Sequence, residues 1–298
     1  MRLDDVAADM SGFEDRRGRG GRGGGLGGMP FGRGGKVGLP AVVLLVVGVL
    51  FKVATGGGGG GGFDVTGALN QLNGGAASSD AAPAAPASSK DAQVLFVGQV
   101  RTLLNDYWSE SFAQSDQAFH KPAMVVFDAP TSTGCGVGQP EAGPFYCPAD
   151  EKIYLDLGFY DQLQQQLGFG GDFAEAYVLA HEYGHHIQNL LGINKDVQDR
   201  SQGAEEAEAN QLSVKLELQA DCFAGAWAKS AYADQKLSTG DLDEALGAAS
   251  AVGDDAIQRK TQGRVDQESF THGSSADRQQ WFRTGFDSGN PERCNTFT

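Results

Sequence analysis

The sequence predicts a helix-rich α+β domain with a small sheet, preceded by one transmembrane helix and a flexible linker. Three observations support this fold class. An apolar run of fifteen residues (37–51) lies near the N-terminus, and sequence rich in glycine and alanine follows it. After that, apolar residues recur mostly at helical spacing. The chain has 298 residues, of which 40% are hydrophobic, so it can form one domain with a buried core.

The composition excludes a nucleic-acid binder as the first interpretation. The chain carries 23 lysine and arginine residues against 38 aspartate and glutamate residues, which gives a formal net charge of −15. Nucleic-acid-binding domains usually carry a basic surface instead. The basic residues gather at the start of the chain, where eight of them, against five acidic residues, lie between Met1 and Lys52.

The apolar run, extended through Ala54, predicts a transmembrane helix over residues 37–54. Fifteen apolar residues fall short of the roughly 20 needed for a full span, but the side chain of Lys52 can reach the membrane surface. Six basic and no acidic residues lie between Arg16 and Lys36, so the positive-inside rule places residues 1–36 in the cytoplasm and the rest outside. A buried core helix and a cleaved signal peptide are the alternatives. They fit less well, because the flanks are glycine-rich and no clear cleavage site follows.

Residues 55–89 are predicted to form a flexible linker. They include seven consecutive glycines (56–62) and a stretch of alanine, serine and proline that ends at Ser89. Such a composition buries too little apolar surface to offset the entropy lost on ordering. The folded domain is therefore expected to comprise residues 90–298.

The spacing of apolar residues assigns the elements of this domain in order. An amphipathic helix is predicted from Val94 to Trp108, and two short strands follow at residues 123–127 and 152–156. A long helix opens with Asp172 as N-cap, where Glu175 completes a capping box, and it ends at Gly192. Further helices are predicted over residues 204–233, 241–251 and 276–286.

The long helix contains the sequence His-Glu-Tyr-Gly-His at residues 181–185. His181 and His185 are four residues apart, so on a helix both imidazoles face one side and can bind one Zn²⁺. Glu182 lies at the flank of that side, where its carboxylate can act as general base toward a zinc-activated water. Because such short motifs also arise by chance, the assignment needs further support.

Two carboxylates in the next predicted helix provide this support. A catalytic zinc needs a third protein ligand and an acceptor that holds a ligand histidine in one tautomer. Glu217 and Asp221 are one turn apart on one helix face, and apolar residues surround them. A solvated acidic face, the common alternative, is therefore disfavoured. We assign Glu217 as the third zinc ligand and Asp221 as the acceptor for a ring N–H, most simply that of His181.

Together these residues resemble the family named Putative neutral zinc metallopeptidase, membrane-anchored bacterial proteins related to the gluzincins. The resemblance covers nearly the whole chain. It is carried by residues 1–5, 14–18, 143–148, 153–156, 171–174, 181–186, 217–225, 271–275 and 294–297. It implies a gluzincin-like zinc metallopeptidase domain in the bacterial cell envelope, with His181, His185 and Glu217 on zinc and Glu182 as general base. The long linker and the acidic stretch 204–210 depart from the pattern, but away from the proposed site.

Peptide hydrolysis also needs a donor to the oxyanion of the tetrahedral intermediate. His272, Tyr146 and Tyr183 are the candidates, and Tyr183 is discounted because it points away from the two zinc-ligating histidines. We assign the catalytic role to His272, with a structural role as the alternative. His186 is expected off the metal face, in core packing or in support of a ligand, and His120 receives no role.

The four cysteines are expected to form disulfides. None of them is spaced as in a four-cysteine zinc site, and an even number outside the membrane favours disulfides, for which three pairings are possible. We favour Cys135–Cys147, which closes a loop rich in glycine and proline. The second pair is then Cys222–Cys294, which ties the C-terminal tail to the helix of Glu217.

The predicted function is that of a membrane-tethered zinc metalloendopeptidase acting on extracytoplasmic proteins or peptides. Metallopeptidases bind an extended peptide at a sheet edge, and strand 123–127 or strand 152–156 is expected to form that edge. The alternative is an envelope scaffold or binding module with a silent zinc site. A structural zinc normally has four protein ligands, whereas only three are found here, which favours the enzyme. The sequence alone specifies neither the oligomeric state nor a regulatory partner.

Overall fold

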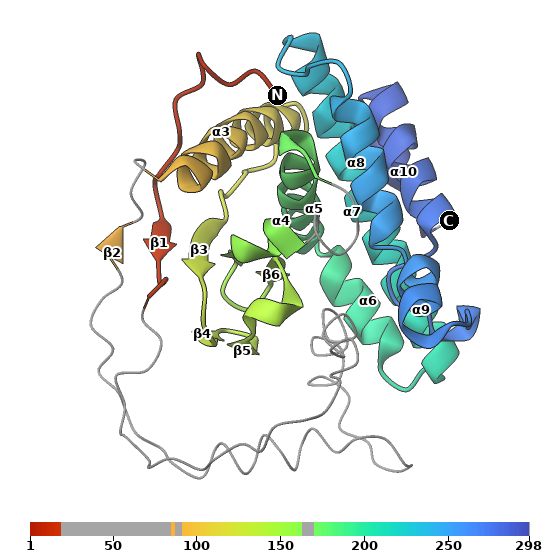
Figure 1. Cartoon of the computed structure of the whole chain (residues 1–298). Coiled ribbons are helices and arrows are strands. Elements are labelled where there is room, and N and C mark those ends of the chain that lie inside the picture. The colour runs from red at the N-terminus through yellow and green to blue at the C-terminus, as the bar shows by residue number, and fades with distance from the viewer. Residues whose placement is uncertain (19–84, 87–90, 163–169, 298) are drawn as a thin grey trace, which may run out of the picture.

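The computed structural model describes residues 1–18, 85–86, 91–162 and 170–297. Their fold is helix-rich α+β, as the sequence predicts. Figure 1 shows the strands on one side of the molecule, helices α7 to α10 on the other, and helix α5 between them. The predicted transmembrane helix (37–54) and most of the predicted linker lie outside the described residues. In the part of the chain that the structure describes, no helix is both long enough and apolar enough to cross a membrane.

Five of the eight helices in the described residues follow the sequence-based assignment, whereas α4, α6 and α9 were not predicted. The eight helices are α3 (Ala92–Ala113), α4 (Gly158–Gln162), α5 (Asp172–Leu190), α6 (Ile193–Ser201), α7 (Glu206–Ala233), α8 (Asp241–Ala251), α9 (Asp254–Gln262) and α10 (Ser275–Ser288). Helix α8 has the predicted bounds, and α3, α5, α7 and α10 differ from theirs by a few residues. At the start of α5, Gly171 is the N-cap and Asp172 the first helical residue, so the predicted capping box is wrong. After α5, Gly192 adopts φ 74°, the left-handed conformation expected there.

The main sheet has five strands in the order β2-β1-β3-β7-β6. The strands are β1 (Phe13–Asp15), β2 (Ala85–Pro86), β3 (Ala123–Phe127), β6 (Phe145–Cys147) and β7 (Lys152–Asp156); β4 (Thr131–Thr133) and β5 (Gly136–Gly138) form a separate pair. Strands β3 and β7 have the predicted bounds but lie inside the sheet, parallel to each other. The expectation that one of them forms the edge is therefore wrong. Strand β6, antiparallel to β7, is the edge strand that packs against α5.

The chain's first eighteen residues, here called the N-terminal strap, belong to the folded domain. Within the strap, β1 pairs in parallel with β3, so that Phe13 lies opposite Met124. The side chains of Leu3 and Phe13 are buried in the main hydrophobic core. The folded unit therefore comprises the strap together with the domain that begins at the N-cap residue Asp91, rather than residues after 90 alone.

Replacing Phe13 by alanine is expected to lower the free energy of unfolding by about 3 kcal/mol, because the side chain is only 4% exposed and a cavity would remain. Urea denaturation of the two proteins measures the difference. Asp4→Ala, an exposed change in the same strap, is the control and should change stability by less than about 0.5 kcal/mol. Equal stability of Phe13→Ala and wild type would show that the strap does not pack into the domain.

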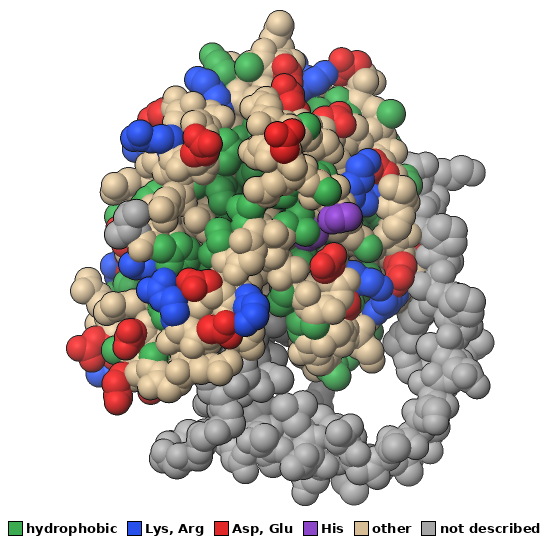
Figure 2. Space-filling model, turned by 180° about the vertical axis from the view of Figure 1, so that it is seen from behind, with side chains coloured by type: hydrophobic (Ala, Val, Ile, Leu, Met, Phe, Trp, Pro, Cys, Tyr) green, Lys and Arg blue, Asp and Glu red, His purple; other side chains and the backbone are tan. Residues whose placement is uncertain are grey.

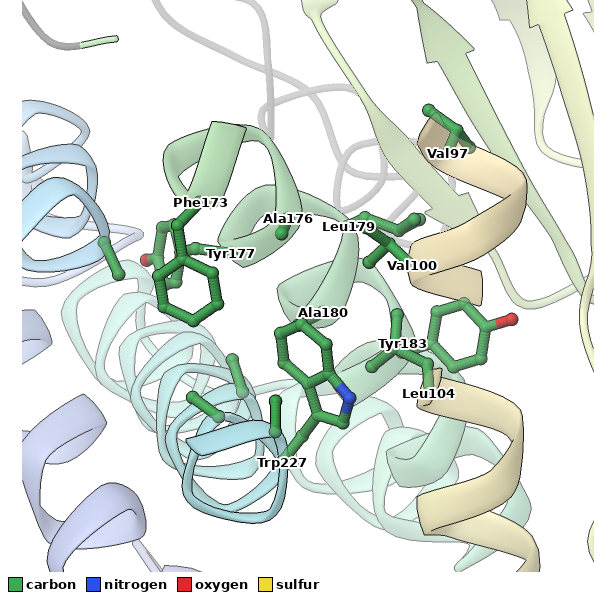
Figure 3. Packing of buried hydrophobic residues seen from close by; sticks show 14 of the residues in the cluster. Val97, Val100, Leu104, Phe173, Ala176, Tyr177, Leu179, Ala180, Tyr183 and Trp227 are labelled. Atoms are coloured by element: carbon green, nitrogen blue, oxygen red, sulfur yellow. The ribbon is translucent and has the colours of Figure 1, made fainter. Parts of the chain in front are cut away.

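Helix α5 lies at the centre of the hydrophobic core. Its apolar side chains contact helix α3 on one side and Trp227 of α7 on another (Figure 3). The α5 residues drawn there are Phe173, Ala176, Tyr177, Leu179, Ala180 and Tyr183, and those from α3 are Val97, Val100 and Leu104. A helix surrounded in this way has little freedom to shift, so it holds the side chains of residues 181–185 in fixed positions.

Helices α7 and α10 pack backbone to backbone through two glycines. A Cβ atom on Gly225 would lie 2.0 Å from the carbonyl oxygen of Phe282, and one on Gly285 would lie 1.9 Å from that of Cys222. Both distances are far too short for a side chain. Glycine at these two positions lets α10 lie close enough to α7 for its side chains to reach Asp221.

Candidate active site

Three potential metal ligands converge between α5 and α7. The Nε2 atom of His181 lies 3.2 Å from Oε2 of Glu217, and Nε2 of His185 lies 3.4 Å from Oε1 of the same carboxylate. One ligand atom from each of the three residues lies within 4.8 Å of the others. The structure thus brings together the three ligands assigned from the sequence.

The close approach of the two helices depends on small residues. A Cβ atom on Gly184 would lie 2.8 Å from Cα of Ala220, so only glycine fits at this crossing point. Gly184 precedes His185, and Ala220 lies between Glu217 and Asp221. The two carboxylates therefore face the histidines directly across the helix contact.

The three side chains fit a zinc ion in kind and in spacing. Two imidazole nitrogens and one carboxylate are a common ligand set for catalytic zinc, which keeps its fourth position open. Ligand atoms about 2.0 Å from a tetrahedral zinc are about 3.3 Å apart, and the two nitrogen-to-oxygen distances here are 3.2 and 3.4 Å. The pocket is of the size that zinc requires.

Asp221 holds the other side of His181. Its Oδ1 atom lies 2.9 Å from Nδ1 of His181, which leaves Nε2 of His181 directed toward Glu217. Asp221 also accepts hydrogen bonds from the Tyr177 hydroxyl at 2.6 Å and from Nε of Arg278 at 2.7 Å. The carboxylate has no solvent exposure, and these partners satisfy its charge.

Tyr177 and Arg278, the two further partners of Asp221, were not predicted from the sequence. Tyr177 lies one turn before His181 on the same face of α5, and this spacing is the signal that could have revealed it. Arg278 is 3% exposed, and its guanidinium also lies 3.8 Å from Glu217. No local pattern distinguishes it from Arg283 in the same helix, because its role arises from the contact between α7 and α10.

The buried charges strongly shift the protonation of the ligands. Burial alone would lower the pKa of His181, but the carboxylates of Asp221 and Glu217 outweigh burial and raise it to about 10. Burial favours neutral Glu217, but the histidines outweigh it and hold the pKa of Glu217 well below its usual range. Without metal, His181 therefore carries a proton at neutral pH.

Zinc binding is expected to release at least one proton at pH 7, because the imidazole of His181 must be neutral to bind the metal. Affinity for zinc should therefore rise with pH, about tenfold per pH unit for each proton displaced, up to the raised pKa. Calorimetric titration of the metal-free protein in two buffers of different ionisation enthalpy measures the number of protons released. A value near zero would contradict the prediction.

Glu182 lies beside the three ligands in a buried position. Its side chain is 7% exposed, and its carboxylate accepts a hydrogen bond from the backbone N–H of Tyr146 in strand β6. Burial raises the pKa of Glu182, although the two histidines oppose this shift. A carboxylate of raised basicity next to a metal pocket is suited to accept a proton.

His272 lies in the loop before α10 and is held by Asp254. Its Nδ1 atom is 2.9 Å from Oδ1 of Asp254, while Oδ2 of Asp254 accepts backbone N–H groups of residues 271–273. The loop passes close to α7 at Gly273, where an added Cβ atom would lie 3.2 Å from the side chain of Leu218, the neighbour of Glu217. The loop therefore sits next to the helix that carries the third ligand, with the imidazole Nε2 of His272 free of these contacts.

The other candidates from the sequence have structural contacts. Nε2 of His186 donates to the carbonyl of His120, and the Tyr146 hydroxyl donates to Nδ1 of His186 while accepting from Asn189. The Tyr146 hydroxyl is thus engaged with His186 and Asn189 in this structure. Tyr183 points away from the ligands, as expected, and donates to Asn105 of α3.

Both predicted disulfides are present. Cys135 is bonded to Cys147 at the end of β6, and Cys222 in α7 is bonded to Cys294 near the C-terminus. Cys222 follows Asp221 directly, so the second bridge fixes α7 one residue from the carboxylate that holds His181. None of the four cysteines is free.

The molecular surface shows where the histidines meet solvent. The side chains of His185 and His272 are 20% and 17% exposed. Seen from behind, histidine side chains reach the surface among hydrophobic ones, and acidic and basic side chains are scattered over the same face (Figure 2).

The chain has relatives among known proteins. The chain is 44% identical over 269 residues to an uncharacterized protein of Escherichia coli, YpfJ, covering 90% of this chain and 88% of the relative. It is 47% identical over 191 residues to an uncharacterized protein of Mycobacterium tuberculosis, Rv2575, covering 60% of this chain and 64% of the relative. No solved structure matches the chain. The family described as "Putative neutral zinc metallopeptidase" matches residues 6–297, and the chain therefore belongs to this family.

Proposed function

We propose that the chain is a zinc-dependent endopeptidase of the gluzincin type that hydrolyses peptide bonds of proteins or peptides. The observation that carries the proposal is the convergence of His181, His185 and Glu217 next to a buried glutamate. A structural zinc site would need a fourth protein ligand and would gain nothing from Glu182. The same geometry therefore disfavours a catalytically silent scaffold.

Each residue of the site has a distinct role in this proposal. The three ligands would hold zinc, which supplies Lewis-acid activation of water and of the scissile carbonyl. Glu182 accepts the proton of the attacking water and later delivers it to the leaving amine, while the N–H of Tyr146 orients its carboxylate. Asp254 holds Nδ1 of His272, and Nε2 of this histidine is proposed to donate to the developing oxyanion.

The substrate is proposed to bind along strand β6. This strand is the sheet edge that packs against α5, and its residue Tyr146 touches the general base through the backbone. An extended peptide that pairs with β6 would pass its scissile bond beside Glu182. Two versions of one substrate peptide test this pairing, one N-methylated on its odd-numbered amides and the other on its even-numbered amides. Only the version whose methyl groups block the hydrogen bonds to β6 should lose affinity. Equal cleavage of the two versions would contradict pairing with β6.

We further propose that residues 37–54 attach the protein to a membrane and that its substrates lie in the bacterial cell envelope. The apolar run supports attachment. The two disulfides support an oxidising compartment, since such bonds persist outside the cytoplasm.

The proposal is tested with the purified full-length chain in detergent. Metal analysis should find one zinc per chain, and an unfolded protein such as casein, or a peptide library, should be cleaved. A chelator should abolish cleavage, and stoichiometric zinc should restore it. One bound zinc with no cleavage of any library member would overturn the endopeptidase and favour the scaffold.

A further inference from the structure

The N-terminal strap is held along its length by the domain that carries the active site. The buried guanidinium of Arg101 in α3 donates to the backbone carbonyls of Asp9, Ser11 and Pro122. Gly98 in the same helix leaves room for the strap, since a Cβ atom there would lie 2.9 Å from that of Ala8. If the strap were elsewhere, the buried guanidinium of Arg101 would lose the carbonyls of Asp9 and Ser11, and leaving a buried charged donor without acceptors costs several kcal/mol of stability.

The strap also reaches the catalytic helix. Nδ2 of Asn105 in α3 donates to Asp9 of the strap, and Oδ1 of Asn105 accepts from the hydroxyl of Tyr183. Tyr183 lies between His181 and His185. One hydrogen-bonded chain therefore connects the strap to the middle of the zinc-binding motif.

The two strands that flank residues 19–84 in the sequence, β1 and β2, lie next to each other in the main sheet. Strand β2 pairs antiparallel with β1, and Asp15 lies opposite Ala85. The apolar run 37–54 falls between these two strands in the sequence. A segment that crossed a bilayer once would put β1 and β2 on opposite sides, about 30 Å apart, and would separate β1 from β3 as well.

We infer that the strap and residues 91–297 lie on the same side of the membrane, so that residues 37–54 do not carry the chain across it once. This orientation differs from the one expected from charge. Two of the six basic residues behind that expectation, Arg16 and Arg17, form ion pairs inside the fold, with Glu14 and with Asp15 and Asp91. The disulfides place the common side outside the cytoplasm. The inference rests on these contacts and not on peptidase activity.

Labelling of single introduced cysteines tests the inference in the full-length protein in bacterial cells. All four native cysteines are paired, so Asp4→Cys in the strap and Tyr232→Cys in α7 each add one exposed thiol. A membrane-impermeant maleimide added to intact cells should label both thiols, and the two extents of labelling should agree within twofold. If one thiol is labelled in intact cells and the other only after the membrane is permeabilised, the inference is overturned. Protection of both thiols would retain the common side but overturn its placement outside.

A second experiment tests whether the strap stays docked in the mature protein. A protease recognition sequence is inserted into the glycine run 56–62 of the full-length chain, which is then purified in detergent and cleaved. The N-terminal fragment should co-elute with the domain and separate only in denaturant. In the matched variant Phe13→Asp, which places a charge in the core position of β1, the fragment should elute separately. Separate elution of the wild-type fragment would overturn the inference.

Discussion

Glu182→Gln is expected to lower the rate of peptide hydrolysis by about 10²–10⁴-fold while one zinc remains bound. Glutamine has the shape of glutamate and still accepts a hydrogen bond from the backbone N–H of Tyr146, so the site keeps its geometry. It cannot accept the proton of the attacking water. None of the three proposed ligands changes, so zinc content should stay the same.

The measurement pairs metal analysis with the cleavage rate of a fluorogenic peptide. Glu208→Gln, an exposed change at the start of α7, is the control and should cleave at the wild-type rate. An unchanged rate in Glu182→Gln would remove Glu182 as general base. Loss of zinc together with activity would assign it a role in holding the metal instead.

Arg278→Met is expected to destabilise the protein by about 3–5 kcal/mol, because the buried carboxylate of Asp221 would lose its cationic partner. Methionine fills a similar volume, so the effect reports charge rather than packing. For a domain of this size the melting temperature should fall by roughly 10 °C. Zinc affinity should fall as well, by about 10–100-fold, since Asp221 would hold His181 less firmly.

Denaturation with and without zinc measures both effects. Arg283→Met, an exposed change in the same helix, is the matched control and should be nearly neutral. The double variant Arg278→Met/Asp221→Asn should regain part of the lost stability, because no buried charge then lacks its partner. A loss below about 1 kcal/mol in Arg278→Met would show that Tyr177 and His181 alone compensate Asp221.

Local patterns predicted most of the domain's helices and two of the three inner strands of the main sheet, β3 and β7. Helical spacing predicted both ends of α8 correctly. The four-residue spacing of His181 and His185 placed two ligands on one helix face without any tertiary information. Glu217 was found by its apolar surroundings, which required it to have a buried partner. These features depend on neighbours within a few turns of the chain, and such neighbours are visible in a sequence.

Features that depend on distant contacts were not predicted. The strap is polar and short, and Phe13 becomes a core residue only through its pairing opposite Met124. The edge position of β6 depends on the order of strands in the sheet, which the sequence of one strand does not encode. Arg278 is functional only because glycines at positions 225 and 285 bring α10 against α7. In each case the information lies in packing between elements that are far apart along the chain.

The place of β1 in the sheet also sets the order in which the protein can fold. It is the first strand to be synthesised, but its neighbour β3 ends at Phe127, more than a hundred residues later. The parallel pair therefore cannot form during early synthesis, and β1 lacks its partner β3 until residues 123–127 have been made. The strap carries exposed charges at Asp4 and Asp5, and charged side chains next to an unpaired strand oppose its association with other chains.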